Sequence, residues 1–151
     1  MVAKIMITTP GQFWKTKSLE DMTPVEWELL CDNCGRCCLQ KMRDGDSGKI
    51  KLLAISCEYL DISTCRCLVY ENRKRLKPDC VKLSPKKLTA AMEWLPDTCA
   101  YRKIAAGKEL DWWHPLVSGD PNTVHQAKIS VRDKIIPGGN LELEELNKIL
   151  L

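Results

Sequence analysis

Residues 31–38 read Cys31-Asp32-Asn33-Cys34-Gly35-Arg36-Cys37-Cys38, and this stretch decides what kind of fold the chain can adopt. In a tight turn, a C-x2-C spacing lets both thiolates face one metal centre. A third cysteine at the same spacing gives C-x2-C-x2-C, which wraps three thiolates around one centre and takes a fourth ligand from elsewhere in the chain. We therefore predict a fold that is organised by a metal bound at this loop.

The spacing also bears on which metal is bound. Zinc sites more often combine two separate cysteine or histidine pairs, and this sequence has no second, separate C-x2-C. Three thiolates in one short run are instead typical of iron–sulfur clusters. We favour an iron–sulfur cluster, preferably [4Fe–4S], and keep zinc as the alternative. Because adjacent side chains diverge, Cys38 could bind a second centre.

More cysteines follow downstream of this run. They are Cys57, Cys65, Cys67, Cys80 and Cys99. The chain thus has nine thiols, enough for two sites of four ligands each and one spare. An isolated cysteine such as Cys99 has a competing explanation, because buried cysteines also serve as small apolar side chains.

The absence of secretory and membrane-spanning segments from the sequence argues against disulfides between the cysteines. The first ten residues lack the apolar stretch of about 7–15 residues that a secretory signal needs. Apolar runs such as 52–55 fall far short of the ~18 residues that a membrane span requires. We therefore expect a cytoplasmic protein without a membrane partner, in which thiols stay reduced and bind metal. Nine is also an odd number, so a closed disulfide framework would leave one thiol over.

The length of 151 residues fits one domain, which we place at residues 1–151. We predict a mainly α fold with short irregular β, in a small cysteine-rich, metal-organised domain. The stretch from Cys31 to Cys99 has too few periodic apolar residues for a large core, so a metal would supply the missing stability. Helix-capping motifs and the alternation of apolar and polar residues predict where the helices and strands lie. The predicted helices begin at Thr23-Pro24-Val25-Glu26, run from Ser84 to Trp94 and from about Asp97 to Ala106, and begin again near Asn140; the predicted strands are 49–52 and 127–132.

The cysteine pattern resembles a known family. The run 31–38, followed by Cys57-Glu-Tyr-Leu60, Cys67-Leu-Val-Tyr70 and Cys80, is similar to the YkgJ-type CxxCxxCC family of bacterial proteins. Further motifs bring the chain closer to the YcgN-like subfamily. These include Glu93-Trp94-Leu95-Pro96, Trp113-His114-Pro115-Leu116 and Ile129-Ser130-Val131-Arg132. The resemblance implies a zinc- or iron-chelating domain over nearly the whole chain.

The resemblance also implies a set of ligands. The core chelating positions of the family fall on Cys31, Cys34, Cys37, Cys38, Cys57, Cys67 and Cys80. Cys65 and Cys99 belong to the subfamily pattern, and we add Cys99 to the predicted ligands. A broader relative, the flagellin lysine methylase, pairs a similar motif with methyl transfer. The resemblance therefore also allows an iron–sulfur enzyme.

A basic stretch suggests a second kind of partner. Residues 66–87 hold eight Lys or Arg against two acids. Positive charge near a thiolate site lowers thiol pKa, but the same stretch could bind a phosphate backbone. A zinc-stabilised module that binds RNA or another anionic partner is therefore the alternative function, and a solvated face is the ordinary explanation. His114 and His125 could bind metal, but Trp113 and Pro115 beside His114 favour packing.

Overall fold

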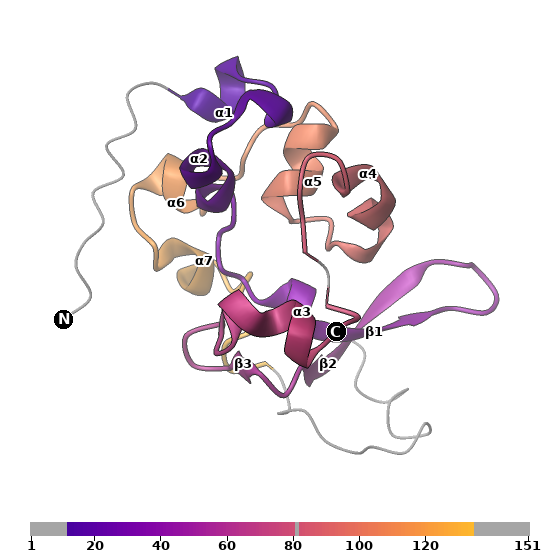
Figure 1. Ribbon diagram of the computed structural model, residues 1–151. Coiled ribbons are helices and arrows are strands. Elements are labelled where there is room, and N and C mark those ends of the chain that lie inside the picture. Colours follow the sequence, from indigo (N-terminus) through magenta and orange to yellow (C-terminus); the bar gives the residue numbers. More distant parts are fainter. Residues whose placement is uncertain (1–11, 81, 135–151) are drawn as a thin grey trace.

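The computed structural model describes residues 12–80 and 82–134, which Figure 1 draws as a coloured ribbon. The α-helices are α1 (Phe13–Thr16), α2 (Pro24–Leu29), α3 (Arg73–Leu76), α4 (Leu88–Ala91), α5 (Ala100–Ala105), α6 (Pro115–Ser118) and α7 (Thr123–Gln126). The 3-10 helices, labelled η, are η1 (Leu19–Asp21), η2 (Arg36–Cys38), η3 (Tyr70–Asn72) and η4 (Met92–Trp94). The strands are β1 (Leu39–Arg43), β2 (Ile50–Ser56), β3 (Leu60–Asp61) and β4 (Arg66–Cys67).

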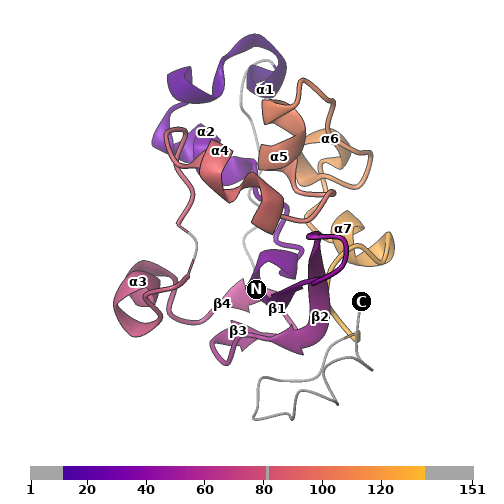
Figure 2. The ribbon, with the colours of Figure 1, turned by 90° about the vertical axis from the view of Figure 1, so that its right-hand side faces the viewer.

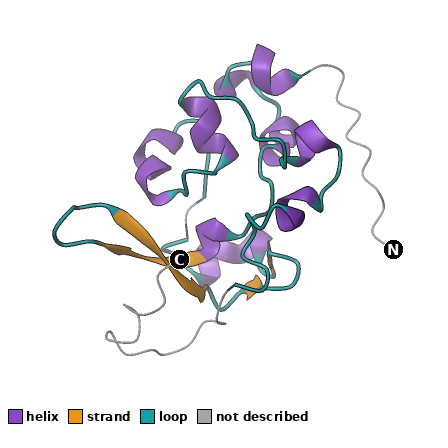
Figure 3. Ribbon diagram, turned by 180° about the vertical axis from the view of Figure 1, so that it is seen from behind, coloured by secondary structure: helices purple, strands orange, loops and turns teal. Residues whose placement is uncertain are grey.

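These elements form two layers, which are separated most clearly in Figure 2. The helical layer contains α1, α2, α4, α5 and α6, the strand layer contains the strands and α3, and α7 lies between them. In the strand layer, β1 pairs with β2 and β3 pairs with β4, each pair antiparallel. Sheets of two strands have little stability of their own in water. Long loops join the elements of both layers (Figure 3).

Each layer has its own apolar core. In the helical layer the buried members are Phe13, Trp14, Leu30, Leu88, Leu95 and Tyr101. The second core, which belongs to the strand layer and the C-terminal end of the described chain, consists of Leu39, Leu60, Cys65 and Val131. The helical layer therefore buries more large side chains than the strand layer does.

The predicted capping box is present at the start of α2. The Thr23 hydroxyl accepts a hydrogen bond from the Glu26 N–H at 3.2 Å, and the Glu26 carboxylate accepts one from the Thr23 N–H at 3.0 Å. These two bonds satisfy N–H groups that the first turn of a helix leaves without partners. The helix then ends at Leu29, and Leu30 leads into the cysteine run.

The next two helices begin later than the sequence predicts. Residues 85–87 form a turn, closed by a bond from the Lys87 N–H to the Ser84 carbonyl, so the helix begins only at Leu88. The α-helix ends at Ala91, and the 3-10 helix η4 continues the helical stretch to Trp94, where the sequence predicts its end. In α5 the first helical residue is Ala100 rather than Asp97, because the Cys99 N–H closes a turn on the Pro96 carbonyl.

One predicted strand is confirmed and the other is wrong. Of the predicted residues 49–52, residues 50–52 belong to β2, which extends to Ser56. Residues 127–132 form no strand, because the N–H groups of Ile129 and Ser130 both bond to the Val124 carbonyl and fold the chain back on α7. The helix predicted near Asn140 lies outside the described residues.

The structure supports a less specific fold class than the predicted mainly α fold. Within residues 12–80 and 82–134, no α-helix is longer than six residues. The structure is a small domain of short helices and a few short antiparallel strands. In the same residues no helix has the length and apolar character needed to cross a lipid bilayer.

Candidate metal centre

A pocket of about 150 Å³ lies where the two layers meet. Its walls include Trp27, Ala100 and Tyr101 from the helical layer, and Tyr70 and Arg73 from the strand layer. Seven of the eight predicted ligands line it. They are Cys31, Cys34, Cys37, Cys38, Cys67, Cys80 and Cys99. The structure therefore brings together cysteines that are up to 68 positions apart in the sequence.

The first four of these cysteines belong to residues 31–38, which we call the ligand loop. Its turns rest on two residues with left-handed backbone, Asn33 at φ +60° and Gly35 at φ +77°. The Asn33 N–H donates to the Cys31 sulfur at 3.4 Å, and the Cys34 N–H donates to the Asp32 carboxylate at 3.0 Å. Left-handed backbone is accessible to Gly and, less readily, to Asn. The sequence therefore permits the tight path that turns these thiols to one pocket.

The remaining pocket cysteines come from both layers. Cys67 ends β4 and Cys80 follows α3, so both belong to the strand side. Cys99 occupies the position before the first residue of α5, in the helical layer. The pocket is thus lined by thiols from both layers.

Two cysteines stand apart from the pocket walls. Cys57 was predicted as a ligand but is not among the lining residues; its N–H donates to the Cys38 carbonyl at 2.7 Å. Cys65, the ninth cysteine, is buried in the small core with Leu60 and Val131. With φ +59° it also forms a tight turn. The packing thus places Cys65 as an apolar side chain.

Burial dominates the electrostatics of most of these thiols. Exclusion of water raises the pKa of Cys31 and of Cys34 above the ordinary value, and the negative charge of Asp32 acts in the same direction. Burial also raises the pKa of Cys99 to about 11, although N–H groups of α5 partly offset this. Such thiols stay protonated without a cation, and a bound cation would favour the thiolate form.

Cys37 differs from its neighbours. A hydrogen bond from the Cys38 thiol and the nearby Lys41 ammonium lower the pKa of Cys37 to about 7. The same hydrogen bond raises the pKa of Cys38. Lys41 is fixed by bonds from its ammonium to the Cys37 carbonyl at 2.7 Å and to the Leu39 carbonyl at 2.9 Å. Nothing in the sequence pattern distinguished Lys41 from the other basic residues.

The donor set suits a soft metal. The side chains that line the pocket from the predicted ligand set are thiols rather than disulfides, and sulfur ligands are typical of zinc and of iron–sulfur clusters. Within the described ranges, no group of three or more His, Cys, Asp or Glu side chains is arranged to hold an ion. The thiols instead line a space that separates them.

The histidines are not part of this pocket. His114 is buried, and its Nδ1 atom accepts from the Leu116 N–H at 3.0 Å. Its Nε2 atom lies 2.8 Å from the Leu30 carbonyl oxygen. The Nδ1 atom of His125 lies 2.7 Å from the Ser130 hydroxyl. The expectation that His114 packs rather than binds metal therefore agrees with its contacts.

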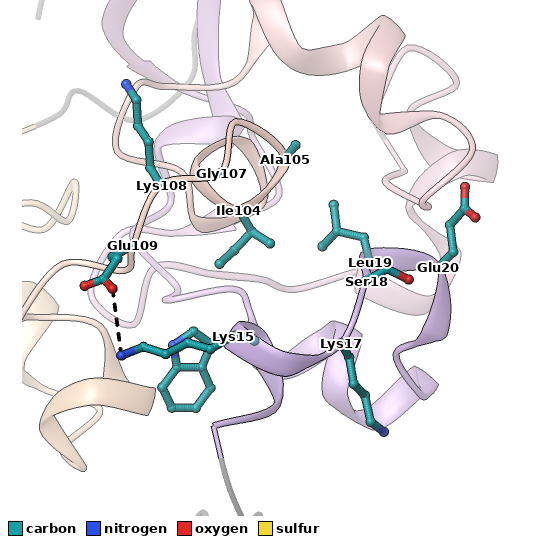
Figure 4. A pocket seen from close by; sticks show the side chains of 11 residues that line it. Lys15, Lys17, Ser18, Leu19, Glu20, Ile104, Ala105, Gly107, Lys108 and Glu109 are labelled. Atoms are coloured by element: carbon teal, nitrogen blue, oxygen red, sulfur yellow. Dashed lines mark ion pairs between the residues drawn. The ribbon is translucent and has the colours of Figure 1, made fainter.

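A second, larger cleft lies elsewhere, at α1, η1 and the C-terminal end of α5 (Figure 4). Its volume is about 620 Å³, and no cysteine or histidine lines it. Lys15 and Glu109 face each other across it at 3.9 Å, and Lys17 is paired with Glu26. The cysteine pocket is thus the smaller of the two spaces but the one with metal-binding chemistry.

Comparisons with known proteins agree with this arrangement. Residues 30–100 match the CxxCxxCC family model, described as "Putative zinc- or iron-chelating domain". A UPF0260 protein of Sinorhizobium fredii (strain NBRC 101917 / NGR234) is 52% identical over 139 residues, which cover 92% of this chain and 89% of the relative. The chain belongs to the UPF0260 family.

Other UPF0260 proteins are similar over most of the chain. The relative from Granulibacter bethesdensis is 56% identical over 124 residues, covering 82% of this chain and 74% of the relative. That from Rhodopseudomonas palustris (strain BisB18) is 54% identical over 125 residues, covering 83% and 73%. No solved structure matches this chain. The resemblance to the CxxCxxCC family is confirmed, while the YcgN-like label stays a prediction.

Proposed function

We propose that this UPF0260 protein holds an iron–sulfur centre in its cysteine pocket. The observation that carries the proposal is the convergence of seven thiols, from both layers, on one space of about 150 Å³. A cavity needs only ~10–15 Å³ to hold one water molecule. The room between the thiols therefore suits a cluster better than a single zinc ion, which its ligands would enclose closely.

The thiols divide into two sets by the elements that carry them. Cys31, Cys34 and Cys37 belong to the ligand loop and Cys99 precedes α5, so these four form one set. Cys38, whose carbonyl accepts from the Cys57 N–H, forms the other set with Cys57 and with Cys67 and Cys80 of the strand side. We assign the cluster to the first set and a second metal position to the second set. Each set then supplies four sulfur ligands, and Cys65 is the spare.

This assignment limits the chemistry that the centre can supply. When all four coordination positions are filled by cysteine, no position is open for a water or a substrate. An iron–sulfur centre of this kind stabilises the fold, transfers electrons or senses redox conditions. The residues of the chain would then bind the centre and shield it from water.

Analysis of metal and sulfide in protein purified without oxygen tests the proposal. We expect iron, acid-labile sulfide and visible absorption in the wild type. The variant Cys37→Ala should lose them, whereas the matched variant Cys65→Ala should keep them, because Cys65 is outside the pocket. A colourless wild type with stoichiometric zinc and no iron would show that the pocket holds zinc rather than a cluster. Equal losses in both variants would contradict the assignment of Cys65.

A second candidate function rests on the exposed basic residues of α3. Lys74 and Arg75 are exposed beside the exposed side chain of Leu76, whereas Arg73 is partly buried and lines the cysteine pocket; an anionic partner such as RNA would bind at the exposed pair. Two of these side chains also have internal bonds, from Arg73 to the Tyr70 carbonyl and from Lys74 to the Cys80 carbonyl. Binding that weakens steeply with salt, and weakens again in Arg75→Glu, would support this function; salt-insensitive binding would exclude it.

A further inference from the structure

Residues far along the chain hold the ligand loop at its start and in its middle. The Leu30 carbonyl, directly before Cys31, lies 2.8 Å from Nε2 of His114. Because Nδ1 of His114 accepts an N–H, its proton is on Nε2, which donates to Leu30. In the middle of the loop, the Cys34 carbonyl accepts from the Val131 N–H at 2.9 Å. Both contacts come from residues beyond the 30–100 region of the family model.

A third bond runs in the opposite direction. The Arg36 Nε donates to the Ile129 carbonyl at 2.6 Å, which joins residues 93 positions apart. Hydrogen bonds from a charged donor are about twice as strong as those between neutral groups. The two bonds at 129 and 131 therefore fix the ligand loop on both sides of Gly35.

The segment that makes these bonds is itself well anchored. Val131 is fully buried, and the Ser130 side chain, also buried, lies 2.7 Å from Nδ1 of His125. A Cβ atom built on Gly35 would lie only 2.8 Å from the Val131 side chain. The loop and the segment thus fit together without spare room.

We propose that His114, Ile129 and Val131 form a clamp that positions the ligand loop and determines how slowly a bound metal centre leaves the pocket. This inference rests on the proposed function, since it requires a metal in the pocket. Release of the centre needs the thiols to separate, and the clamp opposes that movement at the loop carbonyls. The metal-binding unit therefore extends from residue 30 to residue 131.

Release of the bound metal to an excess of chelator tests the clamp in the full-length protein. In Arg36→Met the side chain ends in a methyl group at the position of Nε and so loses the N–H donor, and we expect release about tenfold faster than in the wild type. Arg36→Lys, which keeps the charge and a donor, should restore most of the slow release. The control Arg43→Met removes a charged donor on the β1–β2 hairpin, which is bonded to the Gly48 carbonyl and to the Glu93 carboxylate and does not contact the ligand loop through these bonds. Its release rate should stay within about twofold of the wild type.

Hydrogen exchange at the Val131 amide provides a readout that needs no substitution. If the clamp and the metal together hold the ligand loop, removal of the metal makes the loop more mobile. The Val131 N–H should then exchange faster in the metal-free protein. Equal exchange in both forms, or unchanged release in a folded Arg36→Met, would overturn the clamp. A wild type that binds no metal would overturn the proposed function as well. A wild type that binds metal, with variants that release it at the same rate, would refute the clamp alone.

Discussion

The helical layer and the strand layer are stabilised by different means. Six buried apolar or aromatic side chains form the core of the helical layer. The other core has four buried members, one of which is a cysteine, beneath two-stranded sheets that are weak by themselves. The comparison indicates that burial contributes more to the helical layer, so a centre bound in the pocket would add most to the strand layer.

The pocket lies at the boundary between these layers. Cys99 belongs to the helical layer, and Cys67 and Cys80 to the strand side. A metal centre bound by all three would join the strand layer to the helical layer. Binding energy would then become folding energy for the strand layer.

Removal of the metal should have the largest effect and would test the comparison directly. Structural zinc, for scale, contributes about 10–16 kcal/mol to the folding of small domains. We expect amides of residues 66–80 to lose protection from hydrogen exchange when the metal is chelated under reducing conditions. Amides of the helical layer, such as that of Trp27, should keep theirs. Uniform loss across both layers would show that the layers do not unfold separately.

A pair of leucine truncations should have the next largest effect. Leu88 is 2% exposed in the helical layer and Leu60 is 7% exposed in the strand layer. Each Leu→Ala change should lower the free energy of unfolding by about 2–5 kcal/mol. Only Leu60→Ala should also speed metal release, because Leu60 lies beside Gly35 of the ligand loop. Equal release rates in the two variants would remove the distinction between the layers.

A pair of glycine substitutions should have a smaller effect. Gly35 and Gly48 both have positive φ, +77° and +71°, so alanine at either position costs about 1–2 kcal/mol in backbone strain. At Gly48 a Cβ atom would meet no neighbour, whereas at Gly35 it would clash with Val131. Metal content and thermal unfolding should therefore change more in Gly35→Ala than in Gly48→Ala. Equal changes would mean that the Val131 contact does not matter.

Loss of the α2 cap should have the smallest effect. Thr23→Ala removes the hydroxyl that accepts the Glu26 N–H, at a cost of about 1 kcal/mol. The loss should appear in the unfolding of the helical layer, while metal content stays unchanged. Ser18→Ala is the matched control, because Ser18 precedes η1 and its hydroxyl donates to the exposed Asp21 carboxylate but accepts no backbone N–H. Metal loss in Thr23→Ala would show that the helical layer also controls the pocket.

Much of the local structure could be predicted from the sequence. The capping box at Thr23 and Glu26 formed as predicted, because its bonds span only three residues. The start of α5 was predicted too early, since a turn at Pro96 and Cys99 competes with the helix. The strand predicted at 127–132 was wrong. The alternation of apolar and polar residues does not reveal that the Val124 carbonyl accepts the N–H groups of Ile129 and Ser130.

The sequence by itself determined the ligand loop: four thiols at short spacing, with Gly35 where left-handed backbone is needed. Such local geometry follows from the spacing of the residues. Only the tertiary structure decided that Cys67, Cys80 and Cys99 share one pocket, that Cys65 packs in a core, and that Val131 holds the loop. Contacts between distant residues depend on how the two layers pack, and residue spacing carries no information about that packing.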